Sequence, residues 1–179
     1  VDGHLHLHVH PVVLDALAEL AHEYDIPSVR LPAEELGIAI SLDPRRLATK
    51  AAQAAIFALL RRRGVRRLRR AGIAVADRVY GLHQTGRVDE DYVARLLPRI
   101  EAEWNELYCH PARDFPGEPR NGPVGAGERE LAALVSPRVR EALTAAGLIL
   151  TGSRQAAPRA PAESAASPAP DLSHGEARS

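Results

Sequence analysis

The chain opens with VDGHLHLHVHP (residues 1–11), in which four histidines alternate with leucine and valine. Alternation with a period of two is typical of a β-strand, because successive side chains of a strand point to opposite faces. The four histidines would then share one face, and the aliphatic residues the other. Pro11 suits the first turn of a helix, and apolar residues recur at helical spacing after it. We therefore predict a strand over residues 1–10 and a helix over residues 11–24.

Residues 26–31 indicate a second short strand, so the chain begins with a strand, a helix and a strand, the unit of a parallel α/β sheet or barrel. Farther along, Asp43 before Pro44 is typical of a helix start, and Asp89 can cap another helix. These two helices are predicted over residues 44–63 and 90–101, and Gly64 is expected to end the first. The remaining predicted elements are helices over residues 65–71, 128–134 and 137–146, and strands over residues 78–82, 106–109 and 148–150.

Composition limits the classes of protein to which the chain can belong. Its 179 residues are 45% hydrophobic, which is typical of one globular domain. Lys+Arg and Asp+Glu both number 23, so the zero net charge argues against a global attraction to nucleic acid. Cys109 is the single cysteine, which excludes an intramolecular disulfide and favours a reducing compartment. We expect a cytoplasmic protein, with the inner face of the membrane as an alternative location.

The two ends of the sequence differ in character. Residues 153–179 consist of Ala, Pro, Ser and charged residues with one bulky aliphatic residue, Leu172, so we predict a disordered tail after a domain over residues 1–152. Residue 1 is Val, and the histidine pattern begins at once. We therefore expect a truncated chain whose N-terminal part is missing.

The four histidines are the strongest candidate for chemistry. Imidazole is the commonest neutral metal ligand, and the carboxylate of Asp2 lies nearby in the sequence. An expression tag would be uninterrupted histidine, and a structural strand seldom carries four buried imidazoles that each need a partner. We expect one or two of the histidines to bind a metal ion and the others to support them.

Two further residues are candidates for roles in the site. His110 follows Cys109 at a predicted strand end and could act as a general acid or base, although a histidine before proline is often structural. Arg30, at the end of the second predicted strand, could bind a substrate group. Its alternative is a surface ion pair with Glu34 or Glu35.

Residues 61–70 contain seven arginines. A solvated helix face is the ordinary interpretation of such a run. The alternative is peripheral contact with the headgroups of an anionic membrane. No aromatic residues are interleaved with the arginines, so we do not expect nucleic acid as a partner.

Together these motifs resemble the YdjC-like family of carbohydrate deacetylases over about residues 1–150. The family carries an Asp-Ser/Gly-His-x-His-x-His strand and a later Cys-His-Pro-like strand end, which correspond here to residues 2–8 and to Cys109-His110-Pro111. Within the family, several short segments are most similar to the hopanoid-biosynthesis-associated branch. These segments are Val29-Arg30-Leu31-Pro32, Gly72-Ile73, residues 77–82 and Thr85-Gly86.

The resemblance implies a fold and a set of roles. The fold would be the C-terminal portion of a deformed (β/α) barrel of the polysaccharide-deacetylase-like type. His4 would be a ligand of a divalent metal ion, with His8 less favoured, and the ion would be magnesium, with zinc as the alternative. His110 would be the acid. The family's Asp-Asp-Phe-Gly-like motif does not occur in these residues, and Gly81-Leu82-His83 follows the histidine motif, whereas the family's Gly-x-His motif precedes it. We therefore expect an incomplete barrel that is inactive by itself.

The implied activity is removal of an N-acetyl group from an amino sugar, with an N-acetylglucosaminyl hopanoid lipid as the candidate substrate. One alternative is an amidohydrolase, since Asp-Gly-His-x-His also opens that class, but its usual lysine is hard to place because Lys50 lies inside a predicted helix. Another is a metal-binding fragment without catalytic activity. The sequence does not predict an oligomeric state.

Overall fold

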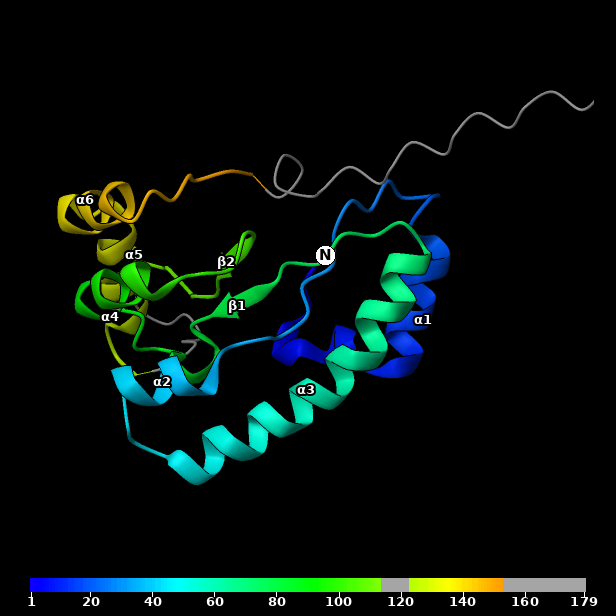
Figure 1. The fold of residues 1–179 in the computed structure, drawn as a ribbon, viewed down its shortest axis with the longest axis horizontal. Coiled ribbons are helices and arrows are strands. Elements are labelled where there is room, and N and C mark those ends of the chain that lie inside the picture. The colour runs from blue at the N-terminus through cyan, green and yellow to red at the C-terminus, as the bar shows by residue number, and fades with distance from the viewer. Residues whose placement is uncertain (114–122, 153–179) are drawn as a thin grey trace, which may run out of the picture.

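The computed structural model describes residues 1–113 and 123–152. Figure 1 shows a short two-stranded sheet between two groups of helices. Helices α1 (Pro11–Leu20) and α3 (Leu47–Arg70) lie on one side. Helices α4 (Glu90–Leu96), α5 (Ala126–Val135) and α6 (Pro137–Ala145) lie on the other, near α2 (Leu36–Leu42). The predicted α/β class is thereby confirmed.

The sheet is parallel and consists of β1 (Arg78–Tyr80) and β2 (Asn105–Leu107), which overlap two of the predicted strands, although β2 begins one residue earlier than predicted. Extended chain continues it on one side. Ser28 forms a parallel bridge with Ala74, and the Arg30 N–H donates to the Val1 carbonyl at 2.9 Å. Four segments, around residues 1, 28–30, 74–80 and 105–107, therefore follow one another across the molecule. A barrel stays a prediction.

The predicted strand over residues 1–10 is wrong. Residues His4–Val9 form a 3-10 element, η1, in which Leu5 and His6 have φ of 52° and 57°. The His6 N–H donates to the Gly3 carbonyl at 3.0 Å, so a hydrogen bond that a strand would offer to a neighbouring strand is used inside the segment. The alternating pattern therefore does not place the four histidines on one face.

The first hydrophobic core lies between α1, α3 and the extended segments. Leu14 and Ala18 of α1 meet Leu68 of α3 there. Helix α1 is shorter than predicted because the chain turns over residues 21–25, where Asp25 has a φ of 47°. The other buried members of this cluster are Val9, Ala21, Val29, Leu31, Ile73 and Val75.

Helix α3 runs through Gly64, where the sequence predicted a stop. A Cβ on Gly64 would lie 2.9 Å from Leu31 Cδ1 and 3.1 Å from Leu14 Cδ2. The glycine therefore lets α3 pack closely against the first core. Helix propensity alone cannot distinguish this role from a C-terminal stop.

We expect Gly64→Val to lower the free energy of unfolding by about 1–3 kcal/mol, because the side chain overpacks against two buried leucines. Gly37→Ala in α2 is the matched control. A Cβ there meets nothing within 4 Å, so alanine should raise stability by up to about 1 kcal/mol through helix propensity. Urea denaturation measures both variants. A Gly64→Val variant as stable as the parent would contradict the close-packing role.

The second core joins α2, α4, α5, α6 and the short η3 (Leu97–Arg99). Asp89 caps α4 as predicted, since its side chain accepts the Tyr92 N–H at 2.9 Å. The helix ends earlier than expected and tightens into η3, which contains Pro98. The buried members of this cluster are Leu42, Tyr80, Val88, Tyr92, Val93, Leu96, Leu97 and Ala133.

Two predicted strands do not form. Residues 26–31 make the isolated bridge at Ser28 and the hydrogen bond from Arg30 to Val1 but no strand, and residues 148–150 have no strand partner among the described residues. Ile149 and Leu150 are exposed, so this apolar run lacks the neighbouring chain that would make it a strand. The predicted tail, residues 153–179, lies outside the described residues, as do residues 114–122. No helix in the described ranges has the length and apolar character needed to cross a bilayer.

Candidate metal centre

Asp2, His6 and His8 come together in the turn at the start of the chain. One donor atom from each side chain lies within 4.8 Å of the others. The Asp2 Oδ1 atom is 3.9 Å from His6 Nδ1 and 3.7 Å from His8 Nδ1. The left-handed backbone at Leu5 and His6 makes this possible, because it folds both rings back toward Asp2. Two imidazoles and one carboxylate are a donor set that suits a divalent transition metal such as zinc.

His8 has a fixed orientation within this group. It is buried, and its Nε2 atom lies 2.6 Å from the Arg30 carbonyl oxygen. A carbonyl oxygen can only accept, so Nε2 carries a proton, and in the neutral ring Nδ1 keeps its lone pair. That Nδ1 atom is buried with no hydrogen-bond partner among the described residues. A buried imidazole held in this tautomer by a backbone carbonyl is the arrangement that prepares a histidine to bind a metal.

His6 offers a second free nitrogen. Its Nδ1 atom is also buried, and no described residue forms a hydrogen bond with it. Burial lowers the pKa of His6 below its ordinary value, although the Asp2 charge opposes that shift. The ring is therefore neutral at pH 7 and can bind a cation. It packs against Phe57 of α3 and against Tyr108, with ring centroids 5.6 and 4.9 Å away.

Gly3 leaves room for His8. A Cβ at position 3 would lie 2.9 Å from His8 Nδ1, the atom that offers its lone pair. Any other residue at this position would therefore crowd that atom.

Arg30 connects the group to the sheet. Its guanidinium forms ion pairs with Asp2 and with Glu106 of β2, and it lies over the Tyr108 ring at 5.5 Å. Arg30 therefore forms these two ion pairs in place of the surface pair with Glu34 or Glu35 that the sequence left open. Arg30 thereby holds the Asp2 carboxylate in place from one side, and its carbonyl orients His8 from the other.

His110 lies beyond Tyr108 in the same cluster. The Tyr108 hydroxyl is 3.0 Å from His110 Nε2, and the two ring centroids are 4.7 Å apart. Burial raises the pKa of Tyr108, so its hydroxyl keeps a proton to donate to Nε2. The Nδ1 atom of His110 is buried and has no hydrogen-bond partner within residues 1–113 and 123–152. One aromatic side chain therefore separates His110 from His6.

Glu130 of α5 holds the His110 backbone. This side chain is buried, and its carboxylate accepts the His110 N–H at 2.5 Å and the Val88 N–H at 3.3 Å. The sequence reasoning missed both Glu130 and Tyr108. A signal for Glu130 was present, because it shares the apolar face of α5 with Ala126 and Ala133. A carboxylate at such a position needs partners.

The structure brings together only some of the residues singled out from the sequence. His8 belongs to the group with Asp2, and Arg30 and His110 lie beside it. His4 and His10 are exposed and lie outside the group. Cys109 is half-buried, and burial raises the pKa of its thiol, which keeps it protonated.

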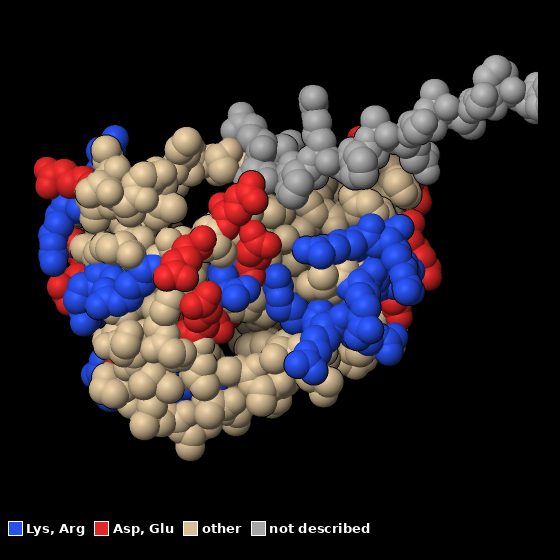
Figure 2. Space-filling model, viewed as in Figure 1, with Lys and Arg blue, Asp and Glu red and all other residues tan. Residues whose placement is uncertain are grey.

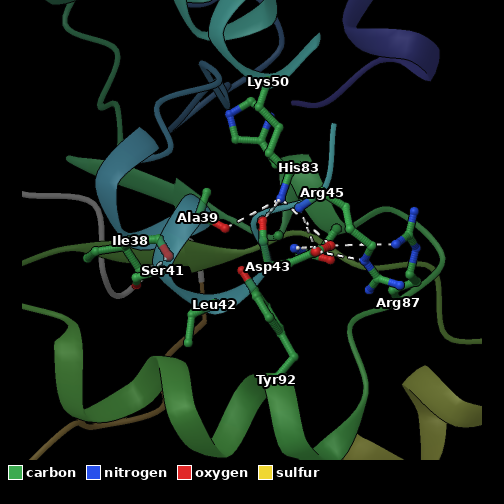
Figure 3. Close-up of polar contacts among 12 residues, drawn as sticks. Ile38, Ala39, Ser41, Leu42, Asp43, Arg45, Lys50, His83, Arg87 and Tyr92 are labelled. Atoms are coloured by element: carbon green, nitrogen blue, oxygen red, sulfur yellow. Dashed lines mark hydrogen bonds and ion pairs between the residues drawn. The ribbon is translucent and has the colours of Figure 1, made fainter. Parts of the chain in front are cut away.

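A second polar cluster surrounds Lys50, the only lysine (Figure 3). The Lys50 ammonium is buried and donates to the Asp43 carbonyl at 2.5 Å and to the Ala39 carbonyl at 3.4 Å. Positive charge at the last carbonyls of a helix stabilises its C-terminus, so Lys50 caps α2. It is therefore committed to the fold, which weighs against the lysine role of an amidohydrolase. His83, close to Lys50 in Figure 3, has its Nδ1 atom 3.4 Å from Gln53 Oε1 and is not part of the metal group.

Comparison with known proteins adds one finding. Searches of curated proteins and of solved structures gave no match. A family model described as YdjC-like protein matches residues 1–145, which is most of the chain and includes η1, β1, β2 and the Tyr108–His110 segment. The chain belongs to the YdjC-like protein family.

Proposed function

We propose that this chain carries the metal centre of a hydrolase that removes an N-acetyl group from an amino sugar. The YdjC-like family is related to carbohydrate deacetylases, which supports a hydrolase. The observation that carries the metal centre is the pair of buried Nδ1 atoms of His6 and His8, which both face Asp2 and find no hydrogen-bond partner in the described part of the chain. Buried polar atoms rarely lack a partner, and a cation would complete this set.

Asp2, His6 and His8 would hold the cation. This assignment differs from the one that the resemblance implied, in which His4 was the first ligand. Magnesium was the expected ion, but two imidazole donors fit zinc better than magnesium, which prefers oxygen ligands. A bound divalent cation supplies Lewis-acid chemistry, polarising the acetyl carbonyl and making nearby water more acidic.

The other residues of the cluster would position and protonate the substrate. Arg30 presents a cation next to the centre and would bind an oxygen of the sugar or of the acetyl group. His110 would donate a proton to the leaving amine as the C–N bond breaks. In the imidazolium, Nε2 would donate to the Tyr108 hydroxyl oxygen, which would leave the Nδ1 proton for that transfer. The resemblance suggests an amino sugar carried on a hopanoid lipid as the substrate.

We expect His8→Ala to weaken zinc binding by more than the roughly 10- to 100-fold that loss of a ligand's hydrogen-bond partner costs, because a ligand itself is removed. Calorimetric titration with zinc and with magnesium measures the affinity. His4→Ala is the matched control, since His4 is a neighbouring but exposed histidine. It should leave the affinity unchanged. Weaker zinc binding by His4→Ala with unchanged binding by His8→Ala would instead favour His4 as the ligand and contradict the Asp2–His6–His8 assignment.

Acetate release from N-acetylglucosamine derivatives tests the activity, with this chain and the product of its complete open reading frame assayed side by side. Metal-dependent release from either protein would support the proposal. Metal binding without release from either one would favour the second candidate, a metal-binding protein without catalysis. Hydrolysis of cyclic amides in place of acetylated sugars would favour an amidohydrolase.

A further inference from the structure

Helix α3 presents a long outward face that the metal centre does not use. Ile56, Leu59, Arg63, Arg66 and Arg70 follow one another at intervals of three or four residues, so they form one stripe along the helix. All five are exposed, and the opposite side of α3 packs into the first core through Phe57, Leu60 and Leu68. The N-terminal part of this face is apolar and its C-terminal part is basic.

The arginines of this helix fall into three groups. Arg61 points inward and donates to backbone carbonyls of the core segments, and burial lowers its pKa. Arg63 and Arg67 pair with Asp15 of α1. The remaining ones form no ion pair with any residue in the described ranges, and they are Arg62, Arg66, Arg69 and Arg70. Figure 2 shows the resulting blue surface over the C-terminal half of α3.

The apolar part of the face makes it more than a solvated basic helix. Ile56 and Leu59 are 58% and 71% exposed, one to two turns before the unpaired arginines. On the adjacent helix, Val12 and Val13 are also exposed, at 70% and 42%. Large aliphatic side chains beside unpaired arginines suit a surface that is both apolar and negatively charged.

We propose that this face of α3 binds the surface of an anionic lipid bilayer. Ile56 and Leu59 would enter the boundary between headgroups and acyl chains, and the four unpaired arginines would contact lipid phosphates. The chain has no net charge, so the attraction would come from this face alone and would orient the molecule on the bilayer. The inference does not depend on the metal centre.

Two other partners fit this face less well. Nucleic acid would use the arginines, but it offers no apolar layer for Ile56 and Leu59, and no aromatic side chain lies between residues 61 and 70 for base stacking. A second copy of the chain could cover the two aliphatic residues. It would bring its own arginine cluster toward the first, and like charges at an interface oppose association.

Cosedimentation with phosphatidylcholine vesicles containing about one third phosphatidylglycerol tests the proposal. The variant is Arg62→Gln/Arg66→Gln/Arg70→Gln. At roughly a fivefold loss for each arginine near the membrane, its partition coefficient should fall about 100-fold. The matched control removes the same charge from the other group of helices, as Arg99→Gln/Arg138→Gln/Arg140→Gln, and should bind like the parent. Ile56→Ser/Leu59→Ser should also bind more weakly.

Three results would overturn the proposal. One is equal binding to vesicles of phosphatidylcholine alone. Another is displacement from anionic vesicles by mixed-sequence duplex DNA or by single-stranded RNA, which would identify a nucleic-acid surface. A third is a dimer in sedimentation velocity that Leu59→Ser converts to a monomer, which would identify the face as an interface between copies. Circular dichroism of each variant confirms that binding is compared between folded proteins.

Discussion

Replacing His110 with alanine is expected to lower deacetylase turnover by about 10²- to 10⁴-fold, the usual contribution of a positioned general acid. Expulsion of an amine requires its protonation, and His110 is the imidazole beside the metal group that is not itself a member of it. The metal content should not change, because Asp2, His6 and His8 all remain. Single-turnover kinetics and metal analysis on the same preparation measure both quantities.

Two features distinguish loss of an acid from general damage to the site. The metal content and the fold should be those of the parent, which general damage would change. An acetylated aniline with electron-withdrawing groups should lose much less rate than an acetylated sugar amine, since its leaving group needs less protonation. His10→Ala, which removes an exposed histidine outside the group, should behave like the parent. Unchanged turnover in His110→Ala would remove the proton-donor role.

Glu130→Ala should lower the free energy of unfolding by about 3–5 kcal/mol. The substitution removes the acceptor of two backbone N–H groups, those of His110 and Val88, and each unsatisfied donor costs about 1–3 kcal/mol. A small cavity in a side-chain site that is only 1% exposed adds to the loss. This is a large share of the 5–15 kcal/mol that is usual for a whole domain. Urea denaturation monitored by circular dichroism measures the change.

Glu130→Gln retains one acceptor oxygen and should cost less than Glu130→Ala. Glu141→Ala provides a surface control in α6, where the side chain is exposed, and should change stability by less than about 0.5 kcal/mol. Amide hydrogen exchange at His110 should accelerate in Glu130→Ala and not in Glu141→Ala. Equal stability of the two alanine variants would show that Glu130 does not hold the His110 segment.

Much of the fold could be predicted from local signals. The Asp89 cap, the strands around Val79 and Glu106 and the helices after residue 125 all depend on neighbouring residues, so periodicity and capping were enough to locate them. The prediction that Gly64 ends its helix is wrong for a physical reason. The local sequence cannot show that Leu14 and Leu31 lie against the helix there, and it is their proximity that favours a glycine.

For the candidate site, the sequence indicated the segments of chain involved better than the individual residues. The histidine pattern drew attention to the segment in which Asp2, His6 and His8 gather, but its period of two favoured a strand. A strand would have kept His4 equivalent to His6 and His8, whereas the turn separates them. Arg30 and His110 lie where the sequence suggested chemistry. Glu130 was missed because its partners are backbone N–H groups, which no pattern of side chains reveals.

The left-handed turn at Leu5 and His6 also has a consequence for the order of assembly. The three donors lie within seven residues of chain, so closing this chelate ring costs little loop entropy, and a cation could be captured before the distant segments dock. The tautomer of His8, however, depends on the carbonyl of Arg30, 22 residues away. The turn would thus bind the cation early. The nitrogen through which His8 binds it would be fixed later, when the extended segment around Arg30 packs beside the turn.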